Sequence, residues 1–349
     1  MRIAVRYAGV RIDEDGHIAG HDAGATLVRR LLRLFPDSQV IGLQPRRCDG
    51  FDVVPVEMVN GDNTVLINMD FYDSVDVWRR LHATCAEPKI MNFVWWGPSS
   101  ITNKVERAAL ALSCALFPTF ANSEHTATEV QEIVDSLTTR AIAEDAQISW
   151  VNLGFRIEHV RPRQEPEVPV VLYPAIYLSE RKRPQFFIDV VERVAKRTPI
   201  QVEARLHETH LIREMAMNLS RRKWAWVGPL TATREGYWQA LARTTAFLAT
   251  STEESYGLEY VEALAAGAVG VFPDLSWARE ILPVGYPFFY KTSREAEELL
   301  YRAVTDTAAC RRELDQCADG DFSAWLQTRH SDDQFEKAIQ ERVRAWFGK

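Results

Sequence analysis

The first half of the chain alternates short apolar runs with stretches whose apolar residues recur every three or four positions. The apolar runs predict strands, and the periodic stretches predict amphipathic helices. The predicted strands cover residues 2–9, 38–43, 63–71, 89–97, 119–123 and 148–155. The predicted helices cover residues 23–35, 74–85, 103–117 and 124–137. Strands separated by helices predict a parallel sheet with helical crossovers.

A proline-rich and charged segment, residues 156–169, interrupts this pattern and is typical of a linker. A second alternating series follows it. Its predicted strands cover residues 170–177, 200–206, 224–228, 246–251 and 268–273. Its predicted helices cover residues 184–197, 211–221, 233–244, 256–267 and 293–306, with a last amphipathic helix at 332–347.

The two series predict an α/β protein with two Rossmann-like domains whose parallel sheets face a central cleft. We expect an N-terminal domain at 1–160, a C-terminal domain at 161–325, and a segment at 326–349 that packs back on the N-terminal domain. Ligands of such sheets bind at the carboxyl ends of the strands. We therefore expect the site in the loops that connect the carboxyl ends of strands to the following helices.

Composition narrows the class of partner. The 349 residues are 46% hydrophobic and 26% charged, which is ordinary for a globular protein, and the net charge of −7 argues against a nucleic-acid partner bound by charge. The five cysteines include no CxxC pair, which favours neither disulfides nor zinc and suits a reducing cytoplasm. No apolar run approaches the roughly 18 residues of a membrane span. We expect no metal site.

Residues 251–267 carry the most informative pattern, because they combine four glutamates with a helix that follows a strand. A capping box of Ser251 and Glu254 explains one glutamate but leaves Gly257 inside the first turns. A helix that begins near Gly257 and ends at Gly267 fits better. We then expect a buried stripe of Leu258, Val261, Leu264 and Ala265.

In this arrangement Glu259 and Glu262 point away from the stripe, and Glu254 lies in the loop before the helix. The backbone N–H groups around Tyr256, Gly257 and Leu258 then form an anion site.

Glu254 and Glu262 are separated by seven residues, and this spacing resembles the E-x7-E motif of retaining, nucleotide-sugar-dependent glycosyltransferases with the GT-B fold. The resemblance spans roughly residues 150–305, and before that it is mainly architectural. Further matches to the family pattern are Asn152, Lys182, Gly228, Thr250-Ser251, Ser255-Tyr256-Gly257, Ala263 and Gly267.

The resemblance implies a metal-independent hexosyltransferase with a nucleoside diphosphate sugar as co-substrate and no other cofactor. Lys182 and the N–H groups of residues 255–258 would hold the diphosphate, with Gly228 also in the donor site. Glu262 would bind the ribose hydroxyls and Glu254 the donor sugar. The acceptor is left open among a glycan, a lipid, a small molecule and a protein.

One departure from the family stands at Tyr177, where the pattern has an arginine. Arg181, Arg183 or Arg205 could replace that guanidinium, or the donor binds differently, or the chain is an inactive member. The alternatives are therefore a catalytically silent sugar-nucleotide or glycan-binding module, or a phosphorylase or epimerase of the same fold. A dehydrogenase is disfavoured because no GxGxxG follows a strand.

Candidate residues in the first half remain open between two interpretations. His125 either reaches the cleft as a catalytic residue or lies at the surface of a helix start. The loop with Gly20 either approaches the ligands or is a plain connection. Asp13-Glu14-Asp15 resembles a metal motif, but the following glycine favours a turn. Trp95-Trp96 suits either sugar stacking or the core. The arginines of residues 29–33 form either a solvated face or a peripheral membrane contact.

Overall fold

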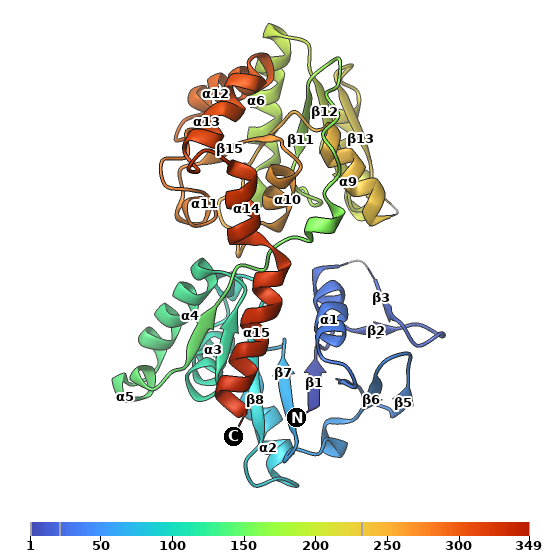
Figure 1. Ribbon diagram of the computed structural model, residues 1–349, viewed down its shortest axis with the longest axis vertical. Coiled ribbons are helices and arrows are strands. Elements are labelled where there is room, and N and C mark those ends of the chain that lie inside the picture. The colour runs from blue at the N-terminus through green and yellow to red at the C-terminus, as the bar shows by residue number, and fades with distance from the viewer. Residues whose placement is uncertain (1, 21, 232, 349) are drawn as a thin grey trace. The chain divides into compact units, whose positions relative to one another are not determined.

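The computed structural model describes residues 2–20, 22–231 and 233–348. The chain divides into two compact units, each with its own sheet (Figure 1). Unit 1 contains residues 1–152 and 335–349, and unit 2 contains residues 153–334. The chain therefore passes from unit 1 to unit 2 and returns to unit 1 near its C-terminus.

Unit 1 is built on an eight-stranded sheet in its described part, with strand order β10-β9-β8-β7-β1-β4-β6-β5. Neighbouring strands are parallel, except that β5 and β6 are antiparallel. The strands are β1 Arg2–Arg6, β4 Gln39–Ile41, β5 Arg46–Arg47, β6 Asp52–Val54, β7 Thr64–Asn68, β8 Lys89–Val94, β9 Thr119–Ala121 and β10 Ile148–Trp150. All five residues of β7 are buried, because helices cover both faces of this part of the sheet.

The helices of unit 1 follow the predicted crossovers. They are α1 Ala23–Leu34, α2 Ser74–His82, α3 Lys104–Leu116, α4 Glu124–Leu137 and the short α5 Arg140–Glu144, with 3₁₀ turns η1 Val56–Met58 and η2 Pro98–Ser100. A hairpin of β2 Arg11–Ile12 and β3 Ile18–Ala19 precedes α1. Asn103 and Ser123 cap the N-termini of α3 and α4 with their side chains, as their residue types favour.

The last helix, α15 Asp332–Phe347, belongs to unit 1 from residue 335 onward. Its residues Phe335, Ile339 and Val343 are at most 1% exposed, at the i, i+4, i+8 spacing of a helix face. The Phe335 ring lies 5.8 Å from that of Phe93 in β8. The helix thus completes the core of the sheet that the first 152 residues build.

Unit 2 has a six-stranded parallel sheet in its described part, with strand order β13-β12-β11-β14-β15-β16. Counted within the unit, this order is 3-2-1-4-5-6, the arrangement of a Rossmann fold. The strands are β11 Val170–Tyr173, β12 Gln201–Leu206, β13 Ala225–Pro229, β14 Ala246–Leu248, β15 Val269–Pro273 and β16 Phe289–Tyr290. The order reverses between β11 and β14, and ligands of this fold bind at that switch point.

The helices of unit 2 connect its strands. They are α6 Pro184–Arg197, α7 Glu208–Leu211, α8 Glu214–Ser220, α9 Arg234–Arg243, α10 Leu258–Ala265, α11 Ser276–Glu280, α12 Ser293–Thr305, α13 Thr307–Gln316 and α14 Phe322–His330, with 3₁₀ turns η3 Ile157–His159 and η4 Glu180–Lys182. Figure 1 shows α6, α12 and α13 on one side of the sheet of this unit and α9 on the other.

The predicted α/β class with two Rossmann-like domains is confirmed. The sequence did not predict the strands β2, β3, β5, β6 and β16 or the helices α5, α11, α13 and α14. The predicted helix at 211–221 corresponds to the shorter α8, and α7 ends at the first residue of the predicted range. Within the described residues, no helix is both long enough and apolar enough to cross a membrane.

Candidate functional site

The helix that carries the glutamates begins and ends where the sequence predicts. Gly257 precedes α10 with a φ of +75°, a conformation that glycine adopts without strain. A Cβ at this position would lie 2.6 Å from the ring of Tyr260, so the site needs glycine for space as well. Gly267, with a φ of +83°, follows the helix.

The buried stripe differs from the prediction. Tyr260, Val261, Ala263 and Leu264 are buried, whereas the predicted members Leu258 and Ala265 are only partly buried. Glu262, which was predicted to point away from the apolar stripe of its own helix, is itself only 2% exposed. The physical reason is α9, which contributes side chains that cover and bind the carboxylate.

Glu254 is held by two groups at one oxygen. Its Oε1 forms an ion pair with Nζ of Lys182 and accepts a hydrogen bond from the Tyr260 hydroxyl at 2.8 Å. Its side chain is 8% exposed. The other oxygen, Oε2, accepts no hydrogen bond from any described residue. It is therefore the oxygen that can bind a hydroxyl of a ligand.

Lys182 also faces Glu259, whose carboxylate lies 3.7 Å from Nζ. Burial by itself lowers the pKa of Lys182, but Glu259 and Glu254 outweigh it and hold the pKa above its usual value. Burial raises the pKa of Glu259, and Lys182 opposes this. The lysine therefore stays protonated beside two carboxylates, one of which takes up a proton more easily than usual.

Glu262 is bound at both oxygens by side chains of α9. Oε1 pairs with the guanidinium of Arg234, and Oε2 accepts a hydrogen bond from the Tyr237 hydroxyl at 2.7 Å. Burial raises the pKa of Glu262, and both partners oppose that rise. Arg234, Tyr237 and Tyr260 are site residues that the sequence analysis missed. The signal available for Arg234 was its position in the first turn of a helix that follows a strand.

Backbone contacts place these side chains at the switch point of unit 2. Lys182 follows β11, and Glu254 follows its sheet neighbour β14. The Thr250 hydroxyl donates to the carbonyl of Lys182 at 2.5 Å, and the Thr252 N–H donates to the carbonyl of Arg181 at 3.0 Å. The two loops are therefore joined, which brings the lysine and the glutamates to one edge of the sheet.

Tyr256, predicted to lie in the anion site, uses its side chain elsewhere in unit 2. Its hydroxyl lies 2.8 Å from Nδ1 of His330 and accepts from the Gly154 N–H at 3.2 Å. Because Nε2 of His330 faces the carbonyl of Ile281 at 3.1 Å, Nε2 carries the proton and the tyrosine donates to Nδ1. Burial lowers the pKa of His330 to about 3, so the imidazole is neutral. Ser255 and Leu258, on either side of Tyr256 and Gly257 in the chain, remain predicted anion-site residues.

Tyr177, which stands in place of the family arginine, packs against two histidines. Its ring centroid lies 5.5 Å from that of His207 and 5.2 Å from that of His210. Of the predicted replacements, Arg205 pairs with Glu203 and lies over the Trp226 ring.

Of the other two, Arg183 lies over the ring of Phe186. Arg181 is near enough to Lys182 to lower its pKa.

Gly228 serves packing in the structure. A Cβ at Gly228 would lie 2.3 Å from the ring of Trp226, which is two residues earlier in the same strand and packs over the glycine. Beside this ring is a hollow of about 430 Å³ on the sheet face under α9, lined by residues that include Glu203, Arg205 and Arg243. Neither Lys182 nor the glutamates of α10 line it, so this hollow is separate from the candidate site.

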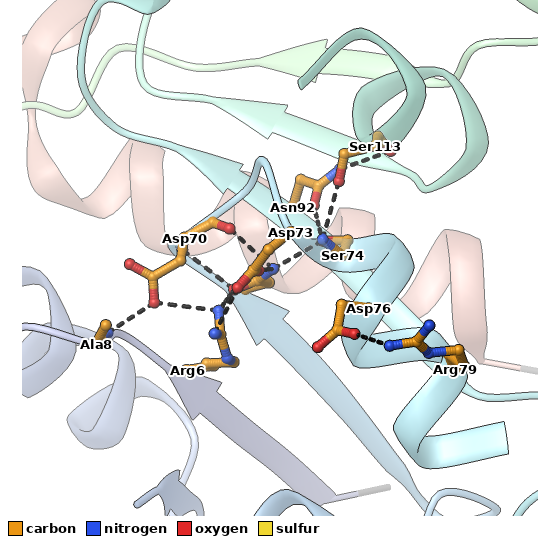
Figure 2. Close-up of polar contacts among 10 residues, drawn as sticks. Arg6, Ala8, Asp70, Asp73, Ser74, Asp76, Arg79, Asn92 and Ser113 are labelled. Carbon is orange, nitrogen blue, oxygen red and sulfur yellow. Dashed lines mark hydrogen bonds and ion pairs between the residues drawn. The ribbon is translucent and has the colours of Figure 1, made fainter. Parts of the chain in front are cut away.

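Unit 1 has a polar network at its own switch point, between β1 and β7 (Figure 2). Arg6 donates to Asp73 at 2.8 Å and to Asp70 at 3.2 Å, and the Ala8 N–H donates to the same oxygen of Asp70 at 2.7 Å. Behind them, the Ser74 hydroxyl donates to Asn92 at 2.5 Å. Asp70 is 9% exposed, and burial raises its pKa.

The far oxygen of Asp70 points away from the network in Figure 2. Close to this edge, Tyr7 and Trp95 meet edge to face with their ring centroids 5.6 Å apart. Asp70 was not predicted from the sequence.

The other residues singled out from the sequence in unit 1 make local structural contacts. The carbonyl of Gly20 accepts from Arg29 at 2.8 Å, and His21 lies outside the described residues. His125 lies in the first turn of α4, 3.6 Å from Glu129.

The acidic residues Asp13, Glu14 and Asp15 lie in the turn between β2 and β3, where the His17 N–H donates a hydrogen bond to the Asp13 side chain at 2.8 Å. Arg30 lies over the Phe335 ring, so this part of the predicted arginine face contacts α15.

Two Rossmann-like units with a charged site at the switch point of the second are the features of the GT-B fold, and the comparisons show that fold. No protein-family model and no curated protein matches the chain. Among solved structures, sucrose-phosphate synthase from Thermosynechococcus elongatus is similar, with a TM-score of 0.71, 10% identity and 99% of each chain covered.

HepE from Anabaena, solved with UDP and glucose, has a TM-score of 0.71 and 14% identity over 99% of this chain and 100% of that chain. The lipopolysaccharide outer core galactosyltransferase WaaB has a TM-score of 0.68 and 14% identity over 99% of each chain. Identities this low establish the fold alone, and they leave open both the activity and the E-x7-E subfamily.

Proposed function

We propose that the chain is a retaining glycosyltransferase that moves a hexose from a nucleoside diphosphate to an acceptor without a metal ion. The observation that carries the proposal is the cluster at the switch point of unit 2, where Lys182 contacts Glu254 and Glu259. A diphosphate leaving group needs a cation, and sugar hydroxyls need carboxylate acceptors. The cluster supplies both at the edge where this fold binds ligands.

Each residue has a role in the proposal. Lys182 and the N–H groups at the start of α10 stabilise the diphosphate as it leaves. Glu262 accepts hydrogen bonds from the ribose, and Oε2 of Glu254 accepts one from the donor sugar. The bond between the anomeric carbon and the phosphate oxygen breaks while the acceptor oxygen bonds to the same face. The proton of the acceptor hydroxyl passes to the leaving phosphate oxygen.

UDP-glucose is the first donor to test, because HepE is described in complex with UDP-glucose and a trehalose-6-phosphate protein with UDP-2-fluoro glucose. For the acceptor, we propose the switch point of unit 1, where Asp70 holds one carboxylate oxygen on Arg6 and Ala8. The far oxygen is then the acceptor of a hydroxyl hydrogen bond.

The experiment is a thermal-shift titration with UDP, GDP, ADP, CMP and dTDP and their sugar conjugates, with and without magnesium. A ligand that binds only the folded state raises the melting temperature by mass action. We expect one nucleotide to act alone and without magnesium. No shift with any of them would refute a donor site in unit 2. A donor that binds but is neither hydrolysed nor transferred supports the second candidate.

That second candidate is a catalytically silent sugar-nucleotide or glycan-binding module, and Tyr177 favours it. The ring between His207 and His210 replaces a guanidinium that would otherwise stabilise the leaving diphosphate. Release of UDP from UDP-glucose, measured with and without candidate acceptors, separates the two functions.

A further inference from the structure

The carboxylate proposed for the ribose is already occupied in this structure. Arg234 holds Oε1 of Glu262 and Tyr237 holds Oε2, and the glutamate side chain is only 3% exposed. Ribose hydroxyls therefore reach Glu262 only after one of these partners moves. Each oxygen could accept a second hydrogen bond, but the burial of the side chain leaves no open approach, so a ribose can bind only if one partner of Glu262 leaves.

Arg234 is the partner whose position allows it to leave. Its side chain is 49% exposed, and it projects from the first residue of α9. Its guanidinium lies 5.0 Å from the ring centroid of Tyr237 and 5.8 Å from that of Trp238, so it rests on aromatic faces rather than inside the core. Tyr237, by contrast, is a rigid ring of the next turn of the same helix.

A departing guanidinium needs a new anion. Glu262 lies three residues after Glu259 on α10, so the two side chains are neighbours on the helix surface. Glu259 in turn lies 3.7 Å from Lys182. Arg234 and Lys182 thus contact glutamates that lie three residues apart on α10, and the proposed diphosphate binds at the N-terminal end of this helix. Tyr177 leaves that diphosphate one guanidinium short of the family pattern.

We propose that Arg234 occupies the ribose carboxylate in the free protein and turns to the diphosphate when the ribose hydroxyls replace it on Glu262. The inference rests on the proposed function and adds a donor-binding residue to it. In both states each charged group of the exchange keeps hydrogen-bond partners. Glu262 trades a guanidinium for hydroxyl donors, and Arg234 trades a carboxylate for a phosphate with matching bidentate geometry.

If this exchange occurs, loss of Arg234 changes the affinity for a nucleoside diphosphate and the affinity for a nucleoside differently. The test measures the affinity of UDP by calorimetry, and that of uridine by competition against UDP, in the unmodified protein and in R234A. We expect UDP to bind about tenfold or more weakly to R234A, because a charge-assisted contact is lost. Uridine should bind equally or more tightly, because its competitor for Glu262 is gone.

Two further variants sharpen the test. R234K keeps the charge without the planar fork, and we expect an intermediate loss for UDP with no loss for uridine. R243A removes an exposed arginine at the other end of α9, and both ligands should keep their affinities. R234K also answers the question if R234A fails to fold.

Equal losses for UDP and uridine would overturn the inference, since they would mean that Arg234 only orients Glu262. Unchanged UDP affinity in R234A would overturn it as well. Failure of the proposed function looks different: the unmodified protein then binds none of the nucleotides tested.

Discussion

Glu254→Gln should bind UDP more tightly while losing transfer. In the free protein, Glu254 and Glu259 share the charge of Lys182, which the diphosphate also requires. The Glu254 carboxylate and a bound diphosphate are like charges, and at about 6 Å apart they repel by roughly 3 kcal/mol at an effective dielectric constant of 20. Partial exposure of the site reduces this, so we expect a gain of about 1–2 kcal/mol, or roughly fivefold to thirtyfold in affinity.

The substitution is chosen to preserve the fold. The glutamine carbonyl still accepts from the Tyr260 hydroxyl, and Lys182 keeps Glu259, so the free energy of unfolding should change by less than about 1 kcal/mol. Glu254→Ala leaves the buried tyrosine hydroxyl without its acceptor and should cost about 1–3 kcal/mol. Turnover should fall at least about a hundredfold in both, because the donor sugar loses its carboxylate.

Calorimetry with UDP and release of UDP from UDP-glucose measure the two effects. Glu253→Gln removes the neighbouring carboxylate, which has no contact with Lys182 among the described residues, and reports the effect of net charge alone. Weaker UDP binding by Glu254→Gln than by the unmodified protein would refute the shared-lysine argument. Turnover within tenfold of the unmodified rate would refute the role of Glu254.

Three further changes test other parts of the structure. Gly257→Ala places a methyl group against Tyr260 at a residue with a φ of +75°. It should lower the free energy of unfolding by about 1–3 kcal/mol and weaken UDP binding. An unchanged melting temperature would contradict this prediction. Burial holds the pKa of His330 at about 3, well below the usual 6.5, so between these pH values the unfolded chain binds one proton more than the folded protein. The free energy of unfolding should therefore fall by about 1.4 kcal/mol for each pH unit from 6.5 towards 3. The same pH dependence of stability in His330→Gln would contradict this. Asp70→Asn should leave UDP affinity unchanged but slow transfer to the acceptor, and transfer kinetics at the unmodified rate would exclude Asp70 from the acceptor site.

Local pattern was enough for the elements that build the site. The helix from Gly257 to Gly267 follows from the spacing of its apolar residues and from the two glycines that bound it. The strands β5 and β16 contain only two residues each, which is too short for any periodicity to appear, and the unpredicted β6 contains three. Their pairing depends on neighbours in the sheet, which a local pattern does not contain.

The partners of the site residues were beyond the same reasoning. Glu262 was predicted to face a ligand, but its burial depends on Tyr237 and Arg234, which are more than twenty residues away in the chain. The backbone N–H of Tyr256 stays a predicted part of the anion site, but the contact of its hydroxyl with His330 was not foreseen. Such contacts are set by the packing of whole elements, so a spacing rule does not reveal them.

The return of the chain to unit 1 has a consequence for synthesis on the ribosome. Phe335, Ile339 and Val343 fill the core of a sheet whose strands emerge before all of unit 2 has been made. The nascent N-terminal sheet must therefore wait with an open apolar face while unit 2 is translated. Chaperones that recognise apolar surface have their longest opportunity during that interval, and a ribosome that stalls before residue 335 releases a chain prone to aggregate.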